Sequence, residues 1–227
     1  MERHFEQDLE RIKTTMLRMG GMVEEMVATA IRALAERDDE LAQRVIGGDR
    51  QVDLMEMEAD DLCRAVLARQ QPTAGDLRFL VAVMKIIADL ERVGDSAVNI
   101  AQSVILLNEE APLDPAVSEI APMAQTTRQM VRDALDAFTR KSADLALQVC
   151  GRDDLVDTAY RNLFRHLHSI MLEDPKKVNR ALHLLLLSRN LERIADHATN
   201  IAEDVIYYVE GRDIRHSGDF TEPAHSN

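Results

Sequence analysis

The chain contains 227 residues with 40 acidic and 27 basic side chains, which gives a formal net charge of −13. This balance, with no dense basic tract, excludes a nucleic-acid-binding surface that neutralises a run of phosphates. Apolar residues make up 46% and charged residues 30% of a chain that has no tryptophan, a composition typical of a helical protein with a buried core.

The cysteines and the first residues indicate the compartment. Cys63 and Cys150 are too few and too far apart for a disulfide framework or a metal-binding knuckle, so we expect buried free thiols in a reducing environment. The N-terminus is charged from residue 2, unlike a secretory signal, and the longest apolar run, Leu184–Leu187, is far too short to span a membrane. We therefore expect a cytoplasmic protein without direct membrane insertion, which reaches the inner membrane only through partners.

Three helices are predicted in the first half of the chain. The first covers residues 2–37, where apolar side chains recur every three or four positions. Within it, Gly20-Gly21 marks a place where another helix can approach closely. The second helix follows Asp38-Asp39 and ends at the sequence RQQPTAGD, and the third covers residues 74–107.

Three further helices follow a proline-rich linker at residues 108–122. The next helix begins at either Pro115 or Pro122, because both are compatible with a first turn, and ends near Arg140. The remaining two helices are predicted at residues 142–172 and 175–210.

The two halves are copies of one unit. LERVGDSAVNIA at residues 90–101 returns as LERIADHATNIA at residues 191–202, with eight of twelve positions identical. The preceding helices match as well, so the sequence predicts an all-α fold, a tandem repeat of two antiparallel three-helix bundles. The first repeat is assigned to residues 1–110 and the second to residues 115–211, and a disordered tail is expected at residues 212–227.

Each repeat carries two acidic pairs with i, i+4 spacing, which places both carboxylates of a pair on one helix face. Four carboxylates from two facing helices form an all-oxygen site suited to hard or borderline divalent cations and to iron. The candidate metal ligands are Asp49, Asp53, Glu91 and Asp95 in the first repeat, and Asp153, Asp157, Glu192 and Asp196 in the second.

Other readings of these pairs remain open. The same spacing occurs on solvated helix faces that bind nothing, in which case the protein is a purely structural helical interaction module. A carboxylate-bridged metalloenzyme is a further alternative, but the chain has no Glu-x-x-His motif and no motif for an activated nucleophile. Asn99 and Asn200, one turn beyond each aspartate, are either metal-site donors or partners in helix–helix hydrogen bonds.

The position of the acidic pair on the third helix predicts an accessible site. Glu91 and Asp95 fall at the margin of the apolar stripe, neither in the core nor fully outside it. Lys85, Arg92 and Ser103 mark the face of this helix that is expected to meet solvent.

Three segments carry a resemblance to a known family. The opening HFEQDLERIKTTMLRMGGMVEEMV, the joint RQQPTAGDLR at residues 69–78, and the LERVGD and LERIAD blocks together resemble the PhoU family of bacterial phosphate-signalling regulators. The likeness extends from His4 to Gly211.

The resemblance implies two similar three-helix bundles, side by side, whose eight paired carboxylates hold metal ions or multinuclear metal clusters. It leaves the metal open among iron, zinc, magnesium and manganese. It also implies a non-enzymatic negative regulator of phosphate uptake and of phosphate-starvation signalling. Such a protein is an adaptor between the ATPase subunit of the phosphate ABC transporter and the sensor histidine kinase of the phosphate regulon, and is expected to be a homodimer.

Overall fold

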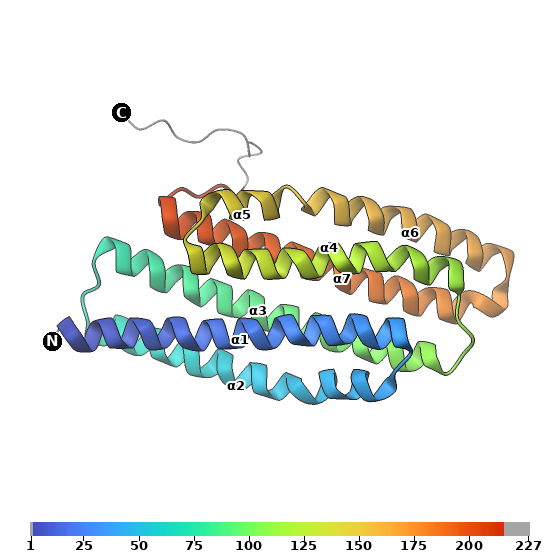
Figure 1. The fold of residues 1–227 in the computed structure, drawn as a ribbon, viewed down its shortest axis with the longest axis horizontal. Helices are drawn as coiled ribbons and strands as arrows, with labels where there is room; N and C mark the ends of the chain where they lie inside the picture. Colours follow the sequence, from blue (N-terminus) through green and yellow to red (C-terminus); the bar gives the residue numbers. More distant parts are fainter. Residues whose placement is uncertain (1, 216–227) are drawn as a thin grey trace.

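The structure is a computed structural model that describes residues 2–215, apart from the side chains of residues 2, 3, 114 and 115. The all-α prediction is confirmed, since no strand occurs within residues 2–215 (Figure 1). The first repeat contains α1 (Glu2–Glu36), α2 (Asp39–Arg69) and α3 (Ala74–Asn108). The second repeat contains α4 (Asp114–Arg140), α5 (Ala143–Cys150), α6 (Asp153–Glu173), the 3₁₀ turn η1 (Pro175–Lys177) and α7 (Val178–Glu210).

Side-chain caps fix the helix starts in the first repeat. Residue Arg37 adopts a left-handed conformation with φ of 54°, which ends α1. Asp38 then caps α2 by accepting a hydrogen bond from the Leu41 amide at 3.0 Å. Before α3, Asp76 accepts hydrogen bonds from the Thr73 amide at 3.3 Å and from the Thr73 hydroxyl at 2.6 Å. Such caps pair polar groups that the first turn of a helix leaves without a partner.

The continuous helix predicted at residues 142–172 is wrong, because the chain breaks there into α5 and α6. The Gly151 amide donates to the Leu147 carbonyl and closes the last turn of α5. Arg152 forms an ion pair with Asp133 of α4, which holds the joint against the neighbouring helix. The apolar periodicity runs through this break and gives no sign of it.

The linker between the repeats is shorter than predicted. The helix α4 begins at Asp114 with Pro115 in its first turn, and Pro122 lies inside the helix. Pro115 therefore opens the fourth helix, where the missing proline amide costs no intrahelical hydrogen bond. Only residues 109–113 separate α3 from α4.

The two repeats lie side by side, and α3 and α7 run along each other between them (Figure 1). Leu90 and Leu191, from the duplicated segment, are fully buried. Burying a leucine contributes about 1.5–3 kcal/mol relative to leaving it exposed. The close approach predicted at Gly20-Gly21 is confirmed, because a Cβ added to Gly20 would lie 2.8 Å from Cδ2 of Leu135 on α4. The repeats therefore share one hydrophobic core.

The face of α3 that was expected to meet solvent is partly covered by α7. Lys85 Nζ lies 2.8 Å from Asp204 Oδ1, and Ser103 is buried, so only Arg92 of the three marker residues is exposed. The periodicity of one helix identifies the stripe that packs within its own bundle. It does not reveal that a second bundle covers the opposite face through polar pairs.

The chain continues in a defined course past α7. Gly211 ends the helix with φ of 71°, and Ile214, within the tail expected to be disordered, is only 4% exposed. Arg215 forms an ion pair with Asp213. Residues 216–227, the rest of that tail, lie outside the described residues. Within residues 2–215, none of the helices is long and apolar enough to cross a membrane.

Candidate metal centre

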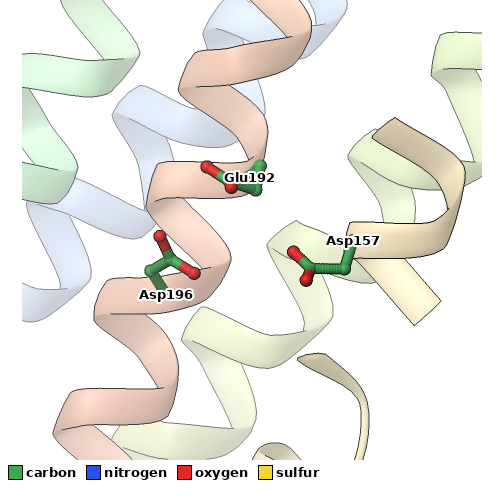
Figure 2. Close-up of side chains that lie close together, drawn as sticks. All are labelled: Asp157, Glu192 and Asp196. Atoms are coloured by element: carbon green, nitrogen blue, oxygen red, sulfur yellow. The ribbon is translucent and has the colours of Figure 1, made fainter. Parts of the chain in front are cut away.

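The second repeat brings three of its four predicted ligands together. Asp157 lies on α6, and Glu192 and Asp196 lie one turn apart on α7 (Figure 2). One carboxylate oxygen from each side chain lies within 4.8 Å of the other two. In residues 2–215 this is the one group of three or more acidic, histidine or cysteine side chains with that proximity. The i, i+4 pair and its partner on the facing helix thus converge as the spacing predicts.

Glu192 is the deepest of the three ligands, at 8% exposure. Its Oε1 pairs with Arg189, one turn earlier on α7. Its Oε2 is buried and has no hydrogen-bond partner in the described part of the chain. A buried carboxylate oxygen without a partner is costly, and a cation between these three carboxylates would relieve that cost. The residues therefore fit a divalent cation.

The electrostatics of this cluster favour a positive ligand. Burial raises the pKa of Asp153 to about 6, with further contributions from Asp196 and Asp157. Burial and then the charge of Asp196 raise the pKa of Glu192. Burial and then the charge of Asp157 raise the pKa of Asp196. The Thr199 hydroxyl donates to Asp153 Oδ1 at 3.4 Å and is its one polar contact from α7 among the described residues. The carboxylates repel one another, and binding a cation would remove this repulsion.

The four predicted ligands of the first repeat also face one another, but less closely. Burial raises the pKa of Asp49, followed by the charges of Asp53 on the same helix and of Asp95 on α3. Burial, then Asp95, raises the pKa of Glu91. No three of these side chains meet the proximity found in the second repeat, within residues 2–215. Glu91 is half-buried, as its predicted margin position requires, whereas Asp95 is exposed and lies further out than predicted.

Two residues near these clusters escaped the sequence prediction. Glu56 lies one turn after Asp53 on α2, and burial and then Asp53 raise its pKa. Arg189 pairs with Glu192 and lies 5.7 Å from the ring centre of Tyr160. Spacing could have identified both residues. Each lies three positions from a predicted ligand, Asp53 or Glu192, and therefore on the same helix face as that ligand.

Alignment of the repeats shows that these two residues are not duplicated. Tyr160 occupies the position equivalent to Glu56, and Ala88 occupies the position equivalent to Arg189. The first cluster therefore has five carboxylates and the second has four carboxylates and one guanidinium. The more compact cluster, in the second repeat, is the one that contains the Arg189 guanidinium.

Asn200 acts in helix–helix contact. Its amide donates to Asp89 Oδ1 on α3 at 3.4 Å, and His197 Nδ1 lies 2.8 Å from the same oxygen. These contacts point away from the acidic cluster. The Asn200 side chain therefore forms a helix–helix hydrogen bond and is not a metal-site donor. The Asn99 backbone carbonyl accepts a hydrogen bond from the Ser103 hydroxyl at 2.9 Å, and the Asn99 side chain forms no hydrogen bond within residues 2–215.

A family model described as the PhoU domain matches this chain twice, over residues 16–104 and 120–205. The chain belongs to the PhoU family. The two matches coincide with the two repeats, so each PhoU domain contributes one acidic cluster.

Relatives carry the same family name over nearly the whole chain. The phosphate-specific transport system accessory protein PhoU homolog of Pseudomonas putida is 44% identical over 218 residues, covering 96% of this chain and 85% of the relative. The phosphate-specific transport system accessory protein PhoU of Escherichia coli (strain K12) is 39% identical over 214 residues, covering 94% and 88%. Both names describe an accessory protein, and neither names an enzyme.

Solved PhoU structures have the same fold. The crystal structure of PhoU from Pseudomonas aeruginosa matches with a TM-score of 0.90 and 43% identity, over 92% of this chain and all of that one. The phosphate transport system regulatory protein PhoU from Streptococcus pneumoniae matches with a TM-score of 0.83 and 27% identity, over 92% and 98%. The tandem-bundle prediction is therefore confirmed.

Proposed function

We propose that this protein is a non-enzymatic negative regulator of phosphate uptake and of phosphate-starvation signalling. The observation that carries the proposal is the likeness, over 96% of the chain, to a relative named as an accessory protein of the phosphate-specific transport system. The absence of any predicted nucleophile–base motif is consistent with action by protein contact.

The proposed mode of action is that of an adaptor. Its partners are the ATPase subunit of the phosphate ABC transporter and the sensor histidine kinase of the phosphate regulon, and it acts as a homodimer. The protein would be cytoplasmic and would reach the inner membrane by binding these partners. Long rigid helices suit this role, because α1 alone has 35 residues and extends about 50 Å.

The proposed cofactor is a metal ion or multinuclear cluster at each acidic cluster, with iron, zinc, magnesium and manganese as candidates. Asp157, Glu192 and Asp196 would hold it in the second repeat, with Asp153 beside them. Asp49, Asp53, Glu91 and Asp95 would hold it in the first. The metal would supply positive charge, and the chain's own carboxylates would then join α2 to α3 and α6 to α7 instead of repelling.

The regulatory function is tested in the source bacterium by deleting the gene and growing the strain in excess phosphate. Phosphate uptake and a reporter of the phosphate-starvation response should both rise, and the intact gene should restore both. Purified protein should also co-purify with the transporter ATPase subunit. Unchanged uptake and reporter signal in the deletion strain would contradict the proposal.

The metal is tested separately by elemental analysis of the untreated purified protein, followed by thermal unfolding of chelator-stripped protein with each candidate metal. Metal should raise the unfolding midpoint, and Asp95→Asn combined with Asp196→Asn should reduce that gain. Asp144→Asn, an exposed change on α5, is the matched control and should leave the gain intact. A midpoint that no metal shifts would exclude the metal and leave the adaptor role to be judged by the deletion strain.

A further inference from the structure

A cavity lies between the repeats, and its lining comes from the start of α1 and α3 and the end of α4 and α7. These four helix ends lie at the same end of the molecule (Figure 1). Its volume is about 510 Å³, and its lining comes from all four of these helices. Tyr208 in the lining is twelve residues beyond Asp196 on α7, about 18 Å along the helix axis. The cavity is therefore separate from the acidic clusters. Its lining includes Gly75, Asp76 and Arg78 from the joint at residues 69–78, a segment to which the proposed function assigns no role.

The walls of the cavity are basic in a chain of net charge −13. Lys13 of α1, Arg78 of α3 and Lys141 at the end of α4 line it. The Arg78 Nε is buried and has no hydrogen-bond partner within residues 2–215. Because that nitrogen is shielded from solvent, an anion in the cavity would meet the remainder of the guanidinium, which forms no ion pair within residues 2–215.

The α3 terminus adds to this positive character. Gly75 lines the cavity in the first turn of α3, and a Cβ added there would meet no atom within 4 Å. The N-terminal end of a helix carries partial positive charge, which favours anions. Of the two acids in the lining, Asp76 is occupied in the Thr73 cap and Glu10 is exposed to solvent. Neither acid forms an ion pair with the cations among the described residues, and three cations against two acids leave the lining with one positive charge in excess.

The floor of the cavity is aromatic. Phe79 of α3, Phe138 of α4 and Tyr208 of α7 line it and lie with ring centres 5.6–6.3 Å apart. The whole chain has only eight aromatic residues, five phenylalanines and three tyrosines, and three of them meet here. The Lys141 ammonium lies 5.4 Å from the Tyr208 ring centre. Phe79 and Phe138 are buried, at 7% and 2% exposure, so the half-buried Tyr208 is the ring of this aromatic floor that meets the cavity, directly beside positive charge.

We propose that this cavity binds a small organic phosphate with an aromatic ring, and we name mononucleotides as the chemical class. Arg78 and Lys141 would bind the phosphate, and the Tyr208 ring, backed by the buried Phe79 and Phe138, would pack against the base. Inorganic phosphate alone would leave the aromatic floor uncovered, and an uncharged ring would leave Arg78 without an acceptor. A volume of about 510 Å³ lies in the range of small-molecule sites.

The test uses the full-length, chelator-treated protein, so that no metal can carry a nucleotide to the acidic clusters. Adenosine monophosphate is titrated by calorimetry, and saturation-transfer NMR reports whether its base protons contact the protein. Adenosine and inorganic phosphate, each alone, should bind at least tenfold more weakly than the monophosphate, because each makes only half of the contacts.

Variants locate the site. Arg78→Gln combined with Lys141→Gln should weaken monophosphate binding at least tenfold. Arg18→Gln, which removes an exposed cation on α1 outside the cavity, should leave binding unchanged, and so should Asp157→Asn combined with Asp196→Asn. Thermal unfolding of each variant confirms that it is folded.

Three results would overturn the proposal. The first is no binding of the monophosphate to the wild-type protein, and the second is equal binding to the wild type and to the Arg78/Lys141 variant. The third is binding of inorganic phosphate as tight as that of the monophosphate, since the aromatic floor would then contribute nothing. None of these results bears on the metal or on the regulatory role, which have their own measurements.

Discussion

His197 on α7 places its Nδ1 2.8 Å from Oδ1 of Asp89 on α3, which joins the two repeats beside both acidic clusters. Successive residues of a helix point about 100° apart. The helix α7 therefore directs Asp196 toward α6 and His197 toward α3. Two residues after Asp89, the helix α3 directs Glu91 toward its own bundle. The inter-repeat contact and the candidate metal ligands thus occupy adjoining faces of the same helical turns.

We predict that this pair couples the repeats energetically. A double-mutant cycle of Asp89→Ala and His197→Ala should give a coupling free energy of about 1–3 kcal/mol, because both side chains are largely buried, at 16% and 11% exposure. Urea unfolding of the four proteins measures it. The exposed pair Arg64–Asp61 on α2 is the control, for which about 0–0.5 kcal/mol is expected. Equal coupling for the two pairs would show that Asp89 and His197 do not hold the repeats together.

Much of this fold could be predicted from the sequence, because long apolar stripes and a duplicated segment specify helices and their repetition. The break at Gly151 could not be predicted in this way, because Gly47-Gly48 occupies a similar place in the first repeat and remains helical. The difference lies in tertiary contact, namely the Arg152–Asp133 pair, which no local pattern contains. The packing of α3 on α7 was hidden for the same reason.

The candidate site could be predicted to the level of helix faces. Spacing places Asp157, Glu192 and Asp196 on facing surfaces, and the structure gathers them. Spacing alone does not set how far each facing helix is rotated, so it could not distinguish the compact second cluster from the wider first one. Duplicated positions reveal the paired carboxylates, but they do not reveal Arg189 and Glu56, because the two copies differ at these positions.

Gly20 and Gly21 provide a test of helix packing between α1 and α4. Gly21→Ala should stabilise the protein by about 1 kcal/mol, because the site is open and alanine favours the helix. Gly20→Leu should destabilise it by about 1–3 kcal/mol, because the side chain would collide with Leu135 in the core. Chemical denaturation measures both, with Gly21→Leu as the size-matched control. A stable Gly20→Leu variant would mean that α1 and α4 do not pack as closely as described.

The raised pKa of Asp153 predicts a pH dependence for the metal-free protein. Its folded pKa of about 6 lies above the ordinary value of 3.8, so between these values the folded state holds the proton more tightly than the unfolded state does. The resulting stabilisation is complete below pH 3.8 and is lost as pH rises through 6. After allowance for solvent screening, the loss is on the order of 1 kcal/mol.

Urea midpoints between pH 4 and pH 7, in the presence of chelator, measure this loss. Asp153→Asn should flatten the decline, whereas Asp144→Asn on the exposed face of α5 should not. Metal competes with protons for the same carboxylates, so saturating metal should stabilise the protein more at pH 7 than at pH 5. A metal-free protein that gains stability over this range would contradict the assigned direction of the shift.

Arg189 predicts that the two clusters differ in metal affinity. Its guanidinium pairs with Glu192, and an incoming cation must compete with it for that carboxylate. Arg189→Gln should therefore tighten metal binding in the second repeat, by a few-fold rather than more, because the arginine side chain is 51% exposed and its charge is screened.

Calorimetric titration with Mn²⁺ measures this affinity in protein that also carries Asp49→Asn and Asp53→Asn, which weaken the first cluster. The control is Arg193→Gln, an exposed arginine on the same helix, for which a smaller change is expected because it has no pair with Glu192 among the described residues. Weaker binding after Arg189→Gln would reverse the interpretation. The arginine would then be a positioning residue that holds Glu192 toward Asp157 and Asp196, and its loss would let the buried carboxylate turn away from the cation.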